Sequence, residues 1–320
     1  MYLLRAGANP SACNMDGETA LHHAVIDNAK ELVAELLMRG TNLSVQSWKA
    51  GTSLHLAAGK GFVEIARKLL AHNAEIELPF DYHGGKYEAR RELDWRSGLL
   101  WNEEGTEMFS RPKKNWITLE RGWTPLYTAV ASGQIELAEL LLDHGANISA
   151  KGCAGETPLY VAASACLAPV VEMLLSRGAN VRGTSNKGNT ALHAIAESAI
   201  VKSNKALADR FKCSCTLRHE AEEAYGHEDH GKSDCIALMM KHGADMDAQN
   251  GLGQTPLSLA VQAGTEYVVT ILVDHISKLP KSFSAQSYLN LLRSCDLKVE
   301  ADILEVIANK CTETDEARVI

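Results

Sequence analysis

Apolar residues in this 320-residue chain recur at helical spacing in short segments that come in pairs. The second segment of one pair places Leu137, Leu140 and Leu141 on one face. It stops at Gly145, where a helix that ends in a left-handed turn needs glycine. The first segment of each pair opens on a threonine, which can accept a hydrogen bond from a free backbone N–H of the first helical turn. The pattern therefore predicts pairs of short helices separated by glycine-containing turns.

One phrase, Thr-x-Leu-His-x-Ala with variations, opens the first segment of each pair. It begins at Thr19, Thr52, Thr124, Thr157, Thr190 and Thr255. Without interruption the interval is 33 residues, and it is longer by 39 residues between Thr52 and Thr124 and by 32 between Thr190 and Thr255. The residue that ends each second segment keeps the same period, at Gly7, Gly40, Asn73, Gly145, Gly178 and Gly243. These two series place the first insertion between two repeats and the second insertion inside one repeat.

The 33-residue period and the phrase Thr-Pro-Leu-His-x-Ala resemble the signature of ankyrin repeat proteins. The resemblance implies an all-α repeat solenoid: an ankyrin array of helix-turn-helix units with projecting β-hairpin fingers. A half repeat at the start leads us to expect an array that begins before Met1. The expected organisation is a partial repeat at 1–13, repeats one and two at 14–79, a tryptophan-rich insertion at 80–119, repeats three to six at 120–280 with an insertion at 199–233, a degenerate capping repeat at 281–311, and a tail at 312–320.

Partners of ankyrin arrays usually bind the fingertips and the face of the first helices, so the resemblance implies a protein-binding surface there. Tryptophan and arginine are enriched in interface hot spots, and long inserted loops are often functional. The candidate partner-binding residues are Trp48, Lys49, Trp95, Trp101, Trp116, Glu120, Arg121, Asn186 and Lys187. The alternatives are that the fingertips are solvated turns and that the inserted tryptophans fold back onto the array.

Histidines of the repeated phrase, at His22, His55 and His193, invite a catalytic hypothesis. A structural role is favoured because tyrosine or serine replaces them in the other repeats, and we assign no catalytic residue. Zinc-type ligands gather near the second insertion, at Cys213, Cys215, His219, His227, His230 and Cys235. Their spacing matches no common zinc signature, and the same segment is also typical of a charged, disordered loop. No metal site and no cofactor are assigned.

Composition narrows the class of partner. The net charge of −8 argues against nucleic acid, and neither an apolar run near 18 residues nor a signal peptide pattern is present. We expect protein partners, no membrane insertion, and a cytoplasmic or nuclear location in which the eight cysteines stay reduced. The predicted function is a non-enzymatic scaffold or adaptor. The alternative is a regulatory or zinc-binding portion of a larger enzyme or signalling protein.

Overall fold

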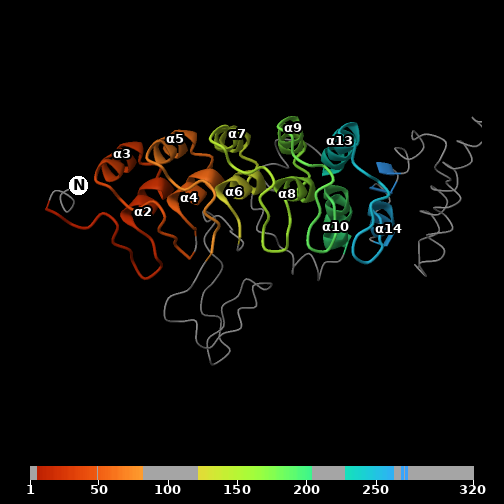
Figure 1. The fold of residues 1–320 in the computed structure, drawn as a ribbon, viewed down its shortest axis with the longest axis horizontal. Coiled ribbons are helices and arrows are strands. Elements are labelled where there is room, and N and C mark those ends of the chain that lie inside the picture. Colours follow the sequence, from red (N-terminus) through yellow and green to blue (C-terminus); the bar gives the residue numbers. More distant parts are fainter. Residues whose placement is uncertain are drawn as a thin grey trace, which may run out of the picture. The chain divides into compact units, whose positions relative to one another are not determined.

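The computed structural model describes residues 6–48, 50–81, 122–203, 228–262, 268–269 and 271–272, and these form successive helix pairs (Figure 1). We call the helices that follow a finger inner helices. They are α2 (Ala20–Ile26), α4 (Ser53–Lys60), α6 (Pro125–Ala131), α8 (Pro158–Ser164), α10 (Ala191–Ser203) and α14 (Pro256–Gln262). The outer helices are α3 (Lys30–Met38), α5 (Val63–Ala71), α7 (Ile135–Asp143), α9 (Ala168–Ser176) and α13 (Glu228–Lys241). The predicted all-α repeat solenoid is confirmed.

The chain divides into two compact units at the bond between Pro158 and Leu159. In the first unit, α4 packs between α2 and α6, while α5 packs between α3 and α7. In the second unit, α9 contacts α13, and α10 contacts both α13 and α14. In the first unit α2, α4 and α6 also pack on their own outer helices, α3, α5 and α7, so the core there is built from local contacts, as in other repeat arrays.

Threonine side chains cap the inner helices α4, α6 and α14, as the sequence predicts. The side chain of Thr52 accepts a hydrogen bond from the backbone N–H of His55, and Thr124 accepts one from Tyr127, each at 3.4 Å. Thr52 itself has an extended backbone, with φ −81° and ψ 167°, as the residue before a helix should. Proline stands at the first helical position of α6, α8 and α14.

The ends of the outer helices also follow the prediction. Gly145 adopts φ +91° after α7, and Asn73 adopts φ +62° after α5. Asparagine is among the few non-glycine residues that tolerate this left-handed conformation, which explains why the periodic glycine can be replaced there.

The leucine of the repeated phrase forms the centre of the core. At each of its six occurrences the side chain is no more than 2 % exposed: Leu21, Leu54, Leu126, Leu159, Leu192 and Leu257. Burying one leucine side chain stabilises a fold by roughly 1.5–3 kcal/mol. The leucine therefore recurs in each repeat because of its packing, and its side chain is not available to a partner.

The second insertion begins and ends in helix. Helix α10 continues to Ser203 and α13 begins at Glu228, so both ends of the 199–233 segment are helical and 204–227 lie outside the described residues. The capping repeat expected at 281–311 also lies outside them. Within the described part of the chain, no helix combines the length and apolar character that a membrane span requires.

Candidate interaction surface

Five-residue fingers precede the inner helices, and all share one hydrogen bond. The first residue of a finger donates its backbone N–H to the carbonyl of the fifth, at 2.8–2.9 Å. This holds for finger 1 (14–18), finger 2 (47–51), finger 4 (152–156), finger 5 (185–189) and finger 6 (250–254). The second and third residues of each finger form its tip. Figure 1 shows these loops projecting away from the outer helices within each unit.

Finger 3 keeps the same geometry although the first insertion interrupts it. The backbone N–H of Phe80 donates to the carbonyl of Trp123, and the N–H of Gly122 donates back to the carbonyl of Phe80, both at 2.7 Å. These are the bonds that the first, fourth and fifth residues make in an ordinary finger. Phe80 is therefore the first residue of finger 3. The inserted chain starts and ends where a fingertip would stand.

Gln46, the residue immediately before finger 2, contacts the base of finger 3. Its amide nitrogen donates to the carbonyl of Pro79, and its amide oxygen accepts from the backbone N–H of Asp81, both at 2.9 Å. Phe80 between them is only 7 % exposed. The base of the insertion is thus fixed by one side chain that contacts the residues on both sides of Phe80.

The histidines of the phrase join neighbouring repeats. Nδ1 of His55 accepts from the backbone N–H of Thr52 at 3.2 Å, and Nε2 lies 3.0 Å from the carbonyl of Trp123 in the next finger. An accepting Nδ1 leaves the ring proton on Nε2, so the neutral ring donates to that carbonyl. His22 and His193 repeat this arrangement toward Gly51 and Gln254, each at 2.9 Å.

Burial lowers the pKa of all three histidines, against the opposing effect of the carbonyl that each contacts. The pKa of His55 falls to about 4. These rings are neutral structural cross-links between repeats, as the sequence analysis favoured. Their burial, 0–1 % exposed, leaves no access for a substrate.

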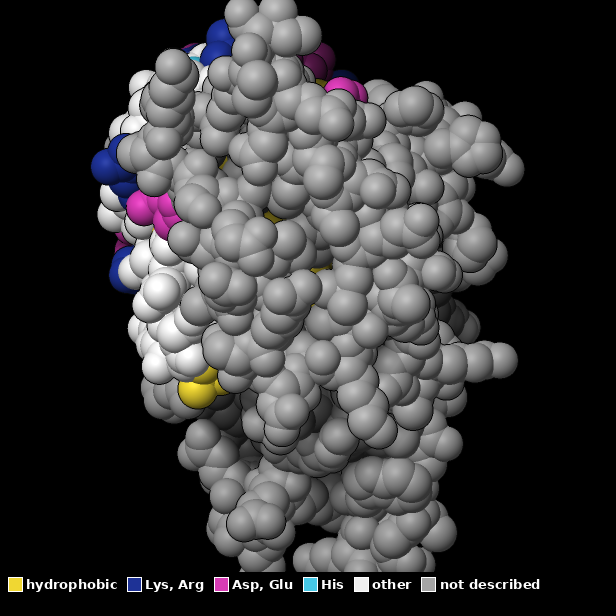
Figure 2. All heavy atoms as spheres, turned by 90° about the vertical axis from the view of Figure 1, so that its right-hand side faces the viewer, with side chains coloured by type: hydrophobic (Ala, Val, Ile, Leu, Met, Phe, Trp, Pro, Cys, Tyr) yellow, Lys and Arg dark blue, Asp and Glu magenta, His cyan; other side chains and the backbone are white. Residues whose placement is uncertain are grey.

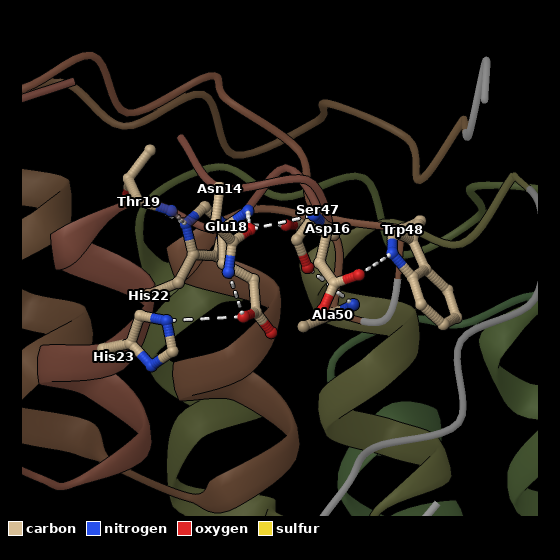
Figure 3. A network of polar contacts seen from close by, with 10 residues as sticks. Asn14, Asp16, Glu18, Thr19, His22, His23, Ser47, Trp48 and Ala50 are labelled. Atoms are coloured by element: carbon tan, nitrogen blue, oxygen red, sulfur yellow. Dashed lines mark hydrogen bonds and ion pairs between the residues drawn. The ribbon is translucent and has the colours of Figure 1, made fainter. Parts of the chain in front are cut away.

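Trp48 lies at the tip of finger 2 and is half-buried. Its indole N–H donates to Oδ1 of Asp16 at 2.8 Å, and its backbone N–H donates to the carbonyl of Asp16 at 3.2 Å (Figure 3). The indole is thus held against finger 1 rather than projecting freely. One side chain therefore both joins two fingers and keeps part of its surface open.

Two further candidates are described, and both are open to solvent. Asn186 and Lys187 form the exposed tip of finger 5, where the carbonyl of Lys187 accepts from the N–H of Gly251 in finger 6 at 2.8 Å. The remaining candidate partner-binding residues lie outside the described residues: Lys49, Trp95, Trp101, Trp116, Glu120 and Arg121.

Met15 and Leu252 are exposed apolar residues at fingertips, and the candidate list did not include them. Met15 in finger 1 is fully exposed, and Leu252 in finger 6 is 83 % exposed. Where Figure 2 shows described residues, charged side chains lie along the upper and left margins and hydrophobic atoms are exposed near the lower margin. Both residues lie shortly before a repeated threonine, Thr19 and Thr255, and large apolar side chains at such solvated turns were the signal that could have selected them.

The zinc hypothesis falls mostly outside the described residues, which include only Cys235 with its side chain. This thiol is fully buried, and burial raises its pKa. No group of three possible metal ligands occurs among the side chains that the structure describes. Cys213, Cys215, His219, His227 and the side chain of His230 lie beyond that part, so metal binding there stays untested.

Paired helices, buried histidine cross-links and solvent-exposed fingertips define a helical repeat protein of the kind that serves as a binding module. The family model for ankyrin repeats in three copies matches residues 1–79 and 99–185, just over half of the chain. The chain belongs to the ankyrin repeat family. Arrays of this family are generally protein–protein interaction modules, and the fold is typically a non-catalytic scaffold.

Among curated relatives, a probable E3 ubiquitin-protein ligase of Oryza sativa subsp. japonica is 32 % identical over 157 residues, 46 % of this chain and 29 % of the relative. A putative ankyrin repeat protein of Rickettsia bellii is 31 % identical over 129 residues, 38 % of this chain and 35 % of the relative. The match thus spans about a third of the length of these relatives. The crystal structure of the human ASB11 ankyrin repeat domain has a TM-score of 0.55 at 21 % identity, covering 85 % of this chain and 89 % of that one, which shows the shared fold.

Proposed function

We propose that this chain is a protein-binding scaffold or adaptor that recognises a partner through its fingertips, its inner-helix face and the inserted loop. The most direct support is that the residues which build the scaffold are buried, while residues at the fingertips are exposed. The leucine of the repeated phrase is buried in every repeat, whereas Met15 and Leu252 expose large apolar side chains at fingertips. An exposed apolar residue at the tip of a rigid turn gains free energy when a partner covers it.

The proposed contact residues are the fingertip and loop residues Trp48, Lys49, Trp95, Trp101, Trp116, Glu120, Arg121, Asn186 and Lys187, joined by Met15 and Leu252. A protein partner is favoured over nucleic acid because the net charge of the chain is −8. A cytoplasmic or nuclear location belongs to the same proposal, because the eight cysteines are expected to stay reduced.

Affinity capture with matched surface variants tests the proposal. The double variant Met15→Asp/Leu252→Asp should lose the proteins that the unaltered chain captures from a lysate of its source organism. Met38→Asp is the control, because Met38 is also highly exposed, at 79 %, but ends the outer helix α3. Equal loss in both variants, or retention in the fingertip variant, would show that the fingertips are not the binding surface.

A second candidate function is the binding portion of a larger enzyme or signalling protein. The short match to the ubiquitin ligase, 29 % of its length, favours this alternative because repeats there form one part of a longer chain. A metal-dependent activity would need the cysteine and histidine residues near the second insertion. Elemental analysis of the purified chain tests that part: stoichiometric zinc that is lost in Cys213→Ser/Cys215→Ser would support it, and its absence would remove it.

A further inference from the structure

Finger 6 begins with the dipeptide Asn250–Gly251, a sequence in which asparagine readily loses its side-chain amide. In that reaction the backbone nitrogen of the glycine attacks Cγ of the asparagine, and ammonia leaves. The succinimide ring that forms then takes up water at one of its two carbonyls, which yields aspartate or isoaspartate. Glycine permits the attack because it has no side chain to obstruct it. Since water is the only reagent, the conformation of the dipeptide decides whether the reaction occurs.

Four hydrogen bonds hold the side-chain amide of Asn250. Its Oδ1 accepts from the backbone N–H groups of Leu252 and Gln254, both at 2.9 Å. Its Nδ2 donates to Oδ1 of Asn189 at 2.9 Å and to Oε1 of Gln254 at 3.2 Å. The amide is thus fixed at both its oxygen and its nitrogen, and moving Cγ onto the nitrogen of Gly251 requires that some of these contacts break.

The attacking nitrogen is occupied as well. The backbone N–H of Gly251 donates to the carbonyl of Lys187 in finger 5 at 2.8 Å. The nitrogen must lose this proton before it can attack, and a carbonyl oxygen accepts the hydrogen bond without being basic enough to remove the proton. Finger 5 also lies close to this nitrogen, since a Cβ atom on Gly188 would lie 2.8 Å from it. Pairing of the two fingers therefore opposes the first step.

The two N–H donors at Oδ1 of Asn250 polarise the amide carbonyl, which by itself would ease attack. That effect operates only once the nitrogen of Gly251 has lost its proton, and the bond to Lys187 opposes this loss while the fingers are paired. Opening of the junction between fingers 5 and 6 therefore controls the reaction. Under such control the rate follows the population of the opened form.

Neither product can rebuild the junction. Aspartate has no amide hydrogens, so its carboxylate would face Oδ1 of Asn189, which now accepts from Asn250. Turning the amide of Asn189 would break its own bond to Oε1 of Glu197, at 2.7 Å, at a residue only 1 % exposed. Isoaspartate instead adds a methylene group to the backbone, which displaces Gly251 from Lys187. A finger that has opened and reacted therefore stays altered.

We propose that Asn250–Gly251 is a deamidation site that the pairing of fingers 5 and 6 keeps closed. Conversion to aspartate or isoaspartate occurs when the junction opens, and each conversion is irreversible. Because the backbone N–H of Leu252 donates to Asn250, the same event alters the tip of finger 6. The junction thus links local opening to a permanent change at a fingertip.

Mass spectrometry of the whole chain after incubation at neutral pH tests the closed state. One sample stays folded, and the other is unfolded in guanidinium chloride. Residues 242–278 form a single tryptic fragment in which Asn250 is the only asparagine, so fragmentation of this peptide locates the mass gain. We expect deamidation of Asn250 to be at least tenfold slower in the folded chain. Equal rates in the two samples would overturn the proposal.

Gly188→Ala should open the junction selectively. Gly188 has φ +77°, and its added Cβ would lie 2.8 Å from the nitrogen of Gly251, so finger 6 must move away. Gly178→Ala is the matched control, since Gly178 also has a positive φ, +86°, but its added Cβ would have nothing within 4 Å. Under native conditions deamidation of Asn250 should be at least fivefold faster in Gly188→Ala. Equal rates in the two variants, both folded by circular dichroism, would refute the role of the junction. The comparison of folded and unfolded chain needs no variant and decides the proposal even if Gly188→Ala fails to fold.

Asn250→Asp carries the side chain of one product and tests whether the change persists. Hydrogen exchange of the Gly251 amide should be at least fivefold faster in this variant than in Asn180→Asp. Asn180 is the control because its Oδ1 also accepts from a backbone N–H, that of Arg182 at 3.0 Å, but at an exposed turn after α9. Equal exchange in the two variants would show that aspartate rebuilds the junction and would overturn the permanent change.

Discussion

Acidification should weaken this fold through His55, whose ring is fully buried between two repeats. Its Nδ1 accepts the backbone N–H of Thr52, and a second ring proton on Nδ1 would oppose that N–H directly, even if it turned to Oγ1 of Thr52 at 2.8 Å. Charging the ring therefore requires the loss of the Thr52 contact as well as the desolvation of a cation. Burial accordingly lowers the pKa of His55 from 6.5 to about 4.

The sign of the effect follows from this pKa difference. The unfolded chain binds a proton at His55 near pH 6.5, whereas the folded chain binds it only near pH 4. The stability that the neutral ring contributes is thus complete above pH 6.5 and is lost as the pH falls from 6.5 toward 4. Between pH 7.5 and pH 5 the expected loss is about 2 kcal/mol, since one pKa unit corresponds to about 1.4 kcal/mol. His22 and His193 act in the same direction because their pKa values are also lowered.

Urea unfolding measured from pH 7.5 to pH 5 tests the prediction. His55→Gln should be less stable at pH 7.5 but should lose about 2 kcal/mol less than the unaltered chain on acidification. His72→Gln is the control for a histidine at the surface, because His72 follows α5 and is exposed, and it is measured over the same pH range. If the unaltered chain and His55→Gln lose the same free energy of unfolding on acidification, the assignment of a buried neutral ring is wrong.

Two backbone predictions concern the repeat itself. Cys166 adopts φ +56° at a turn where Gly133 stands in the preceding repeat with φ +69°. Cys166→Gly should therefore raise the free energy of unfolding by about 1 kcal/mol, and Gly133→Ala should lower it by about 1 kcal/mol, both measurable by urea titration. Thr52→Ala removes the cap of α4 and the partner of His55, and should lower the thermal midpoint through a loss of about 1–2 kcal/mol; an unchanged midpoint would contradict the cap.

The scaffold could be predicted from sequence because the phrase that opens the inner helix, with its buried leucine, recurs six times. Period, threonine caps and the left-handed Asn73 all follow from local rules that the repeats make visible. Trp48 makes a contact that these local rules do not predict. Its fingertip position was predictable, but its hydrogen bond to Asp16 joins residues 32 positions apart in two fingers. The burial of Glu18, 5 % exposed, with no hydrogen-bond partner for its Oε1 atom among the described residues, was equally invisible, because burial is set by packing between segments.

Finger 3 shows how the array accommodates an insertion. The period alone allowed either Phe80 or Leu119 to begin this finger, since both stand in register with a neighbouring repeat. The two hydrogen bonds of Phe80 with Gly122 and Trp123 show that Phe80 is the first residue of the finger. Closing a loop costs entropy that grows only with the logarithm of its length, so a finger can hold a long insertion when its base is firmly bonded.

Removing the insertion separates the two alternatives that the sequence left open for it. Deletion of residues 81–119 joins Phe80 to Glu120 and restores an ordinary five-residue finger with the 33-residue period. If the inserted chain serves a partner and not the fold, the deletion should stabilise the array by up to about 2 kcal/mol, the entropy of closing the longer loop. If its tryptophans pack back onto the array, the deletion should instead lower the free energy of unfolding, because their buried area is lost. Urea unfolding of the deleted chain beside the unaltered chain decides between these outcomes, since they differ in sign.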